Sequence, residues 1–261
     1  MPVNIEFADW LGIGIAAVFF VIYAVIALYP HILSHDEVYK LGLWSAGIAF
    51  LNAILQSALL KDIGYFLRWD GREFNWLRWV IITLTVTLSH AIATCHGWHD
   101  FVEGQAAIVA SLLSGLCFLG AGLSAHEARW LWFVFGLLAY VVAVALILVR
   151  ADYDIVRGKL KRTMLFIYLL GTAVFYLLNI IVLFFSPELL NVIKNITVRD
   201  WVYWAGTNGL VIMPVLALLF YQPVPESKVN SSYATVPNAA NSNANMAAVD
   251  GTLMQMKNKA H

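Results

Sequence analysis

Long apolar runs alternate with short polar segments along the first 222 residues. A helix needs roughly 20 apolar residues to cross about 30 Å of hydrocarbon. The runs that meet this length are residues 10–29, 41–60, 77–95, 105–124, 130–149, 164–185 and 201–221. They predict an all-α membrane domain of seven helices over residues 1–222. The first run is too long, and lacks the basic front, for a cleavable signal peptide, so we expect it to stay in the protein.

The pattern changes abruptly after residue 222. Pro223, Pro225 and Pro237 introduce a stretch rich in asparagine, alanine and serine at 238–248. Such a composition cannot bury enough apolar surface to fold alone, so residues 223–261 are predicted to be a disordered tail. The two halves of the helical region show no sequence repeat, which argues against the inverted-repeat transporters.

Composition supports a membrane protein and excludes other classes. Hydrophobic residues make up 61% of the chain, charged residues only 12%, and the mean hydropathy is +0.75. Soluble domains carry about a quarter charged residues. The 16 basic and 16 acidic side chains cancel, so nothing points to a nucleic-acid partner. Cys95 and Cys117 both lie in apolar runs, which excludes a disulfide scaffold or a four-ligand zinc module. The lipid bilayer is therefore the predicted partner.

Basic residues indicate how the helices are oriented. Cytoplasmic loops carry an excess of lysine and arginine. The connection between the fifth and sixth runs concentrates Arg150, Arg157, Lys159, Lys161 and Arg162. We therefore expect the N-terminus outside and the tail in the cytoplasm. The sequon at Asn195 would then face outward, which makes Asn195 a predicted glycosylation site.

Several local patterns, in this order, resemble the microbial (type 1) rhodopsin family. They are Gly47-Ile48-Ala49-Phe50, Asn75-Trp76-Leu77-Arg78-Trp79, Ser114-Gly115-Leu116-Cys117, Gly120-Ala121-Gly122-Leu123 and Arg129-Trp130-Leu131-Trp132-Phe133. In that family, too, an arginine followed by an aromatic residue opens the third helix, as Arg78 does here. The resemblance covers nearly all of residues 1–222 and implies a rhodopsin-like seven-helix bundle.

The residues that form a retinal pigment in that family have no counterpart here. The family uses a lysine in the seventh helix to form the Schiff base, whereas residues 201–221 contain no lysine and Ile212 takes the aligned position. The family also has two carboxylates in the third helix and one in the seventh. The aligned positions here are Ile81 and Ile92 in the third helix and Asn208 in the seventh. The chain thus resembles the lysine-lacking opsin-related proteins. This resemblance implies no covalent retinal, no resident cofactor, and an association with the plasma membrane and with stress.

One polar stripe could form a path through the bundle. Arg78 is the charged residue at membrane depth, and Thr83, Thr87 and His90 follow it at helical spacing, with Asn208 on the seventh helix. The first interpretation is a gated path for ions or protons. The second is that Arg78 reaches back to the interface, the threonines bond to their own helix, and His90 is simply hydrogen-bonded. The sequence shows no obvious partner for Arg78, because Asp200 lies at the outer end of the last run.

Other polar residues leave similar alternatives. Amides in apolar helices either line a residual cavity or join neighbouring helices, and here they are Asn52, Gln56, Asn179 and Asn208. A loose cluster at the inner end of the third helix is predicted to be a surface histidine patch, not a metal site, because the matching ligand on another helix, His126, is predicted to lie on the outer side. Its members are His90, Cys95, His96 and His99.

Three functions remain open from the sequence. The leading hypothesis is a non-photoactive, rhodopsin-fold membrane protein with a transport- or stress-related role. The second is a carrier or channel for protons or a small solute. The third is an apolar-ligand-binding or sensory protein that signals to a cytoplasmic partner through its tail or through residues 150–163, alone or as a homo-oligomer. No catalytic constellation supports an enzyme.

Overall fold

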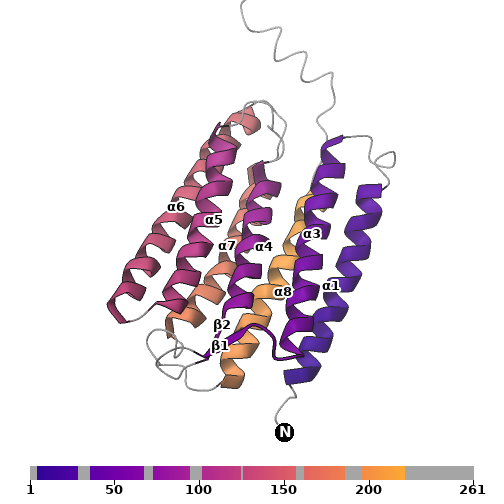
Figure 1. Cartoon of the computed structure of the whole chain (residues 1–261). Coiled ribbons are helices and arrows are strands. Elements are labelled where there is room, and N and C mark those ends of the chain that lie inside the picture. The colour runs from indigo at the N-terminus through magenta and orange to yellow at the C-terminus, as the bar shows by residue number, and fades with distance from the viewer. Residues whose placement is uncertain are drawn as a thin grey trace, which may run out of the picture. The chain divides into compact units, whose positions relative to one another are not determined.

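The computed structural model describes residues 5–28, 36–67, 73–94, 102–124, 126–156, 162–185 and 196–220 (Figure 1). The described helices are α1 (Ile5–Leu28), α3 (Asp36–Leu59), α4 (Trp76–Thr94), α5 (Val102–Leu123), α6 (His126–Val156), α7 (Arg162–Phe185) and α8 (Ile196–Phe220). Together they form an all-α, seven-helix bundle. The predicted tail at 223–261, the sequon at Asn195, and Cys95, His96 and His99 lie outside the described residues.

Helix α4 occupies the centre of the bundle. It packs against α3 and α5 and also reaches α6, α7 and α8, while α1 pairs with α3, α5 with α6, and α7 with α8 (Figure 1). Arg78, Thr83, Thr85, Ser89 and His90 are all buried on this helix. Its polar side chains therefore face neighbouring helices, as expected for polar groups in a membrane bundle.

The outer surface of the bundle suits a bilayer. Large apolar side chains such as Val18, Leu138, Val141 and Leu170 are exposed. By length and composition, α1, α3, α4, α5, α6 and α7 can each cross a membrane. Over its described residues α8 is not among them, because Arg199, Asp200, Thr207 and Asn208 lower its hydropathy. The chain is an integral, multi-pass membrane protein, and six of its seven described helices are by themselves long and apolar enough to cross a membrane.

Two features differ from the sequence expectations. Helix α3 begins at Asp36 and α6 continues to Val156, so both extend beyond the predicted apolar runs and α3 includes Lys40 in its first turns. A short antiparallel hairpin of β1 (Tyr65–Leu67) and β2 (Glu73–Asn75) lies before α4, with Tyr65 opposite Asn75. Strands of three residues are too short to show the period-two alternation that predicts a strand.

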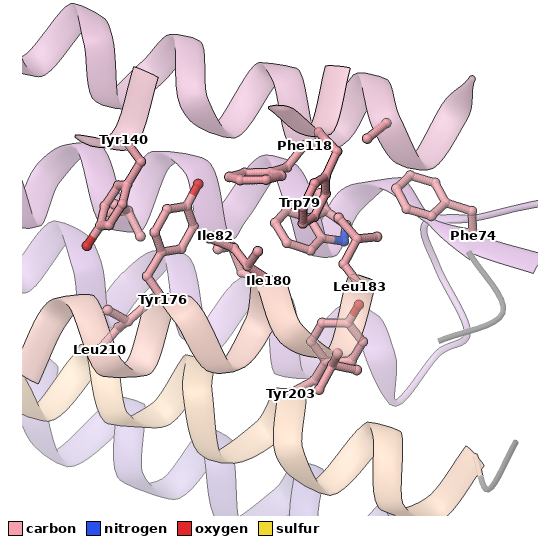
Figure 2. Packing of buried hydrophobic residues seen from close by; sticks show 14 residues of the cluster. Phe74, Trp79, Ile82, Phe118, Tyr140, Tyr176, Ile180, Leu183, Tyr203 and Leu210 are labelled. Atoms are coloured by element: carbon pink, nitrogen blue, oxygen red, sulfur yellow. The ribbon is translucent and has the colours of Figure 1, made fainter. Parts of the chain in front are cut away.

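Aromatic residues fill the interior between α4, α5, α6 and α7 (Figure 2). The ring of Phe118 lies 5.9 Å from that of Trp79 and 6.0 Å from that of Tyr176. Tyr140 meets Tyr176 edge to face at 4.9 Å. Tilted and edge-to-face rings are the preferred arrangement of packed aromatics. This part of the bundle is a packed core.

Close contact between α4 and α5 depends on Gly115. A Cβ atom at this position would overlap the side chain of Thr83, whereas nothing lies within 4 Å of a Cβ placed at Gly14. We expect Gly115→Ala to lower the free energy of unfolding by about 1–3 kcal/mol through overpacking. Gly14→Ala should leave the free energy of unfolding unchanged or raise it by about 1 kcal/mol or less, because alanine has a higher helix propensity than glycine. Unfolding of the two variants in detergent measures the difference, and equal stabilities would contradict this packing.

Candidate functional site

Arg78 is positioned by the start of α4. The backbone N–H of Arg78 donates to Oδ1 of Asn75 at 2.9 Å, so Asn75 is the N-cap of the helix. The side chain of Arg78 points into the bundle, where the residue is 7% exposed. Its Nη1 lies 3.7 Å from Oδ1 of Asp200, and its guanidinium lies 4.4 Å from the ring centroid of Tyr203. The partner that the sequence did not reveal is thus Asp200 at the start of α8.

A cavity of about 190 Å³ surrounds this ion pair. It lies at the end of the bundle where α1, α4 and α8 begin and where the β hairpin is found, which we call the hairpin end (Figure 1). The charged residues that line it are Asp9, Asp62, Arg78 and Asp200. The aromatic residues that line it are Tyr65, Trp201, Tyr203 and Trp204. Its lining is therefore rich in carboxylates and aromatic rings.

Asp62 reaches the cavity because of how α3 ends. The N–H of Asp62 donates to the carbonyl of Leu59, and that of Ile63 to the carbonyl of Ala58, which is the Schellman pattern. Asp62 takes the left-handed position of this motif, with φ of 52°. Aspartate tolerates that conformation better than most residues. The turn thus places an exposed carboxylate at the mouth of the cavity.

Amide side chains continue inward from the cavity. Gln56 lines it and lies one helical turn from Asn52 on α3. Nδ2 of Asn52 donates to Oδ1 of Asn208 at 2.9 Å, and Nδ2 of Asn208 donates to the carbonyl of Trp204 at 3.0 Å. Asn52 and Asn208 thus join α3 to α8, whereas Gln56 lines a cavity. Both interpretations of the amides are represented in the structure.

The five residues of the predicted path fall into two groups. Arg78 lines the cavity and Asn208 bonds to Trp204, which also lines it. The hydroxyls of Thr83 and Thr87 donate to carbonyls of their own helix, at Trp79 and Thr83 respectively. The structure therefore does not align all five along one row.

His90 belongs to a separate environment. Its Nδ1 lies 2.8 Å from Oγ of Ser111 on α5, and its ring stacks on that of Tyr140 on α6 at 5.7 Å. Only 1% of the residue is exposed. His90 thus faces α5 and α6, away from the amide pair that joins α3 to α8.

Sequence reasoning missed several residues of the cavity. Asp9 and Asp62 line it, and hydropathy does not single them out because each lies just outside an apolar run. Gln56 also lines it, as one of the two interpretations of the amides predicted. A useful signal was available: carboxylates at the ends of three predicted spans, Asp9, Asp62 and Asp200, all fall on the predicted outer side with Arg78.

The position of Ile212 bears on the missing retinal lysine. Ile212 is 40% exposed, so its side chain lies on the outer face of α8, and the neighbouring Val211 is fully buried. Within the described residues α8 contains no lysine at any register. Lysines of the described chain are Lys40 in the first turns of α3 and Lys61 in the turn after it.

Known structures show the fold clearly. The chain is similar to a thermophilic rhodopsin from Rubrobacter xylanophilus, with a TM-score of 0.71 and 17% identity over 84% of this chain and 96% of that one. It is similar to the light-driven proton pump rhodopsin of Coccomyxa subellipsoidea, with a TM-score of 0.71 and 17% identity over 84% and 97% of the two chains. It is also similar to halorhodopsin, a light-driven chloride pump, with a TM-score of 0.71 and 14% identity over 84% of this chain and 95% of that one. No protein-family model and no curated protein matches the sequence.

These identities establish the fold alone. The protein is a multi-pass membrane protein with the seven-helix fold of the microbial rhodopsins. The expected fold class is thereby confirmed, and the resemblance to microbial rhodopsins is confirmed at the level of structure.

Proposed function

We propose that this protein is a rhodopsin-fold membrane protein that works without covalent retinal, similar to the lysine-lacking opsin-related proteins. The observation that carries the proposal is the lysine-free helix α8. A retinal imine needs a primary amine inside the bundle. A protonated imine also needs a nearby anion, because an unpaired charge at membrane depth is costly. Asn208 offers a neutral amide that is already bonded to Asn52.

The aromatic core supports the same proposal. Trp79, Phe118, Tyr140 and Tyr176 contact one another between α4, α5, α6 and α7 (Figure 2). Protein interiors are close-packed, so rings in mutual contact leave little room for a polyene. From the resemblance to the lysine-lacking opsin-related proteins we also infer a transport- or stress-related role in the plasma membrane.

An absorption spectrum tests the proposal. The full chain is purified in detergent and incubated with all-trans-retinal. We expect the spectrum to remain that of the free aldehyde in the near ultraviolet. A visible band that bleaches with hydroxylamine would contradict the proposal.

A second candidate is a carrier of protons or of a small solute. It is favoured by the cavity at the hairpin end and by the polar amides that lead inward from it, at Gln56, Asn52 and Asn208. Signalling to a cytoplasmic partner through the tail or through 150–163, and homo-oligomerisation, stay predictions.

The proposed orientation places the N-terminus outside and the C-terminus in the cytoplasm. It rests on the basic residues at 150–162. We expect a reporter fused after Gln222 to be cytoplasmic and a reporter fused at the N-terminus to be extracellular. Protease accessibility in intact cells measures both. An extracellular reporter after Gln222 would reverse the orientation and remove the basis for glycosylation at Asn195.

A further inference from the structure

We propose that the cavity at the hairpin end binds a small protonated organic amine, best a short aliphatic diamine. This inference goes beyond the proposed function and does not depend on it, because the cavity lies among α1, α3, α4 and α8 and shares Tyr203, but none of Trp79, Phe118, Tyr140 and Tyr176, with the aromatic core. Four observations carry it: the excess of carboxylates, an unpartnered acceptor, the aromatic lining and the size of the cavity.

Carboxylates outnumber cations among the residues that line the cavity. Asp9, Asp62 and Asp200 face a single guanidinium, that of Arg78. Arg78 is paired with Asp200, which also accepts from Nε of Arg199 at 3.2 Å. Asp9 is only 9% exposed, and no hydrogen bond or ion pair joins its carboxylate to another described residue. The charge of Arg78 stabilises the carboxylate of Asp9, but Arg78 is already paired with Asp200, so a bound cation would lower the cost of burying this second carboxylate.

The acceptor is the side-chain oxygen of Gln56. Gln56 is 1% exposed and lines the cavity, and its Oε1 has no hydrogen-bond partner among the described residues. Gly12 on α1 makes room for this amide, since a Cβ there would lie 2.8 Å from Cδ of Gln56. A buried acceptor without a donor favours a ligand that carries N–H groups. An ammonium group supplies three such donors.

The aromatic rings suit an organic cation. Cations bind over the faces of tryptophan and tyrosine, and Arg78 already occupies the ring of Tyr203 in this way. The rings of Trp201 and Trp204 lie 5.5 Å apart, edge to face. Nε1 of Trp204 donates to the carbonyl of Ala8 at 2.7 Å, which fixes this indole beside Asp9.

The volume of the cavity favours an organic cation over a bare metal ion as its ligand. The cavity measures about 190 Å³, whereas a water molecule takes about 30 Å³. The space therefore holds a chain of several heavy atoms. Three carboxylates and one guanidinium line the cavity, and a second guanidinium, that of Arg199, bonds to Asp200, so an excess of negative charge remains that favours a cation. The second ammonium group of a short diamine can donate to the acceptor of Gln56.

The test titrates 1,4-diaminobutane into the full-length protein in detergent at constant ionic strength. Binding is followed by calorimetry and by the fluorescence of tryptophan, since Trp201 and Trp204 line the site. We expect saturable binding of one diamine per chain. Asp9→Asn should weaken it about tenfold or more, through loss of a charge-assisted hydrogen bond. Gln56→Leu keeps the charge and should weaken it severalfold.

A matched control separates the site from general electrostatics. Glu127→Gln removes one carboxylate from an exposed position in the first turn of α6, at the same end of the bundle, and should leave binding unchanged. If Asp9→Asn does not fold, Asp62→Gly removes a lining carboxylate in a left-handed turn that suits glycine, and it should weaken binding.

Three results would overturn the inference: no saturable binding of the diamine, an equal loss of affinity in Glu127→Gln and Asp9→Asn, or displacement of the diamine by an equal concentration of sodium ions. A retinal adduct would contradict the proposed function but would not contradict diamine binding at the hairpin end.

Discussion

Arg78→Met is expected to lower the free energy of unfolding by about 2–3 kcal/mol, because it removes one of the two guanidinium partners of Asp200 in a largely buried site and leaves only Arg199 bonded to it among the described residues. The side chains of Arg78 and Asp200 are 8% and 15% exposed. Methionine keeps much of the length of arginine, so the lost interactions are the ion pair and the contact with the ring of Tyr203. Unfolding of the purified protein in mixed micelles at neutral pH measures the loss.

Two further variants identify the cause. The double variant Arg78→Met/Asp200→Asn removes both charges and should recover part of the loss, which gives the coupling energy of the pair. Lys61→Met removes a basic residue at an exposed position near the same end, and it should change stability by no more than about 0.5 kcal/mol. An Arg78→Met variant as stable as Lys61→Met would show that Arg78 reaches the interface and is not held inside.

His90→Ala is expected to lower the free energy of unfolding by about 2–4 kcal/mol. The imidazole is buried, bonded to Ser111 and stacked on Tyr140, so its removal leaves a void and an unpartnered hydroxyl. Thr87→Val is the matched control on the same helix. It should cost about 1 kcal/mol or less, since among the described residues the hydroxyl of Thr87 bonds to its own helix, at the carbonyl of Thr83.

The same two variants test the carrier hypothesis. Reconstitution in vesicles with a pH-sensitive dye measures proton flux for each variant. If His90 has only a structural role, flux per folded molecule stays the same in His90→Ala. A folded His90→Ala variant with no flux, against normal flux in the parent protein, would instead establish a relay through His90.

The helices could be predicted from the sequence because their signal is local. The run 105–124 corresponds to α5 at Val102–Leu123, and the run 164–185 corresponds to α7 at Arg162–Phe185. Helix ends were less predictable, since α3 and α6 continue past the apolar residues through hydrogen bonds that hydropathy does not report. The turn at Asp62 and the hairpin after it depend on backbone geometry, which no apolar pattern encodes.

The site was predictable only in part. Arg78 stood out because it is a charge at the edge of an apolar run. Its surroundings could not be predicted, because Asp9, Gln56 and Asp200 come from three other helices. The partner of His90 is Ser111 on α5, which is likewise set by helix packing. For Thr83 and Thr87 the sequence left two interpretations open, a path or bonding to their own helix, and their hydroxyls do bond to carbonyls of their own helix.

The central claim is that no lysine of the folded protein forms an imine with retinal. The most direct measurement is borohydride reduction of the full-length protein after incubation with all-trans-retinal, followed by mass analysis of its peptides. Reduction converts any imine to a stable retinyl-lysine, so the result does not depend on a spectrum. We expect no retinyl adduct on any lysine, since α8 carries no lysine within its described residues. A retinyl adduct on a lysine of the folded protein would contradict it.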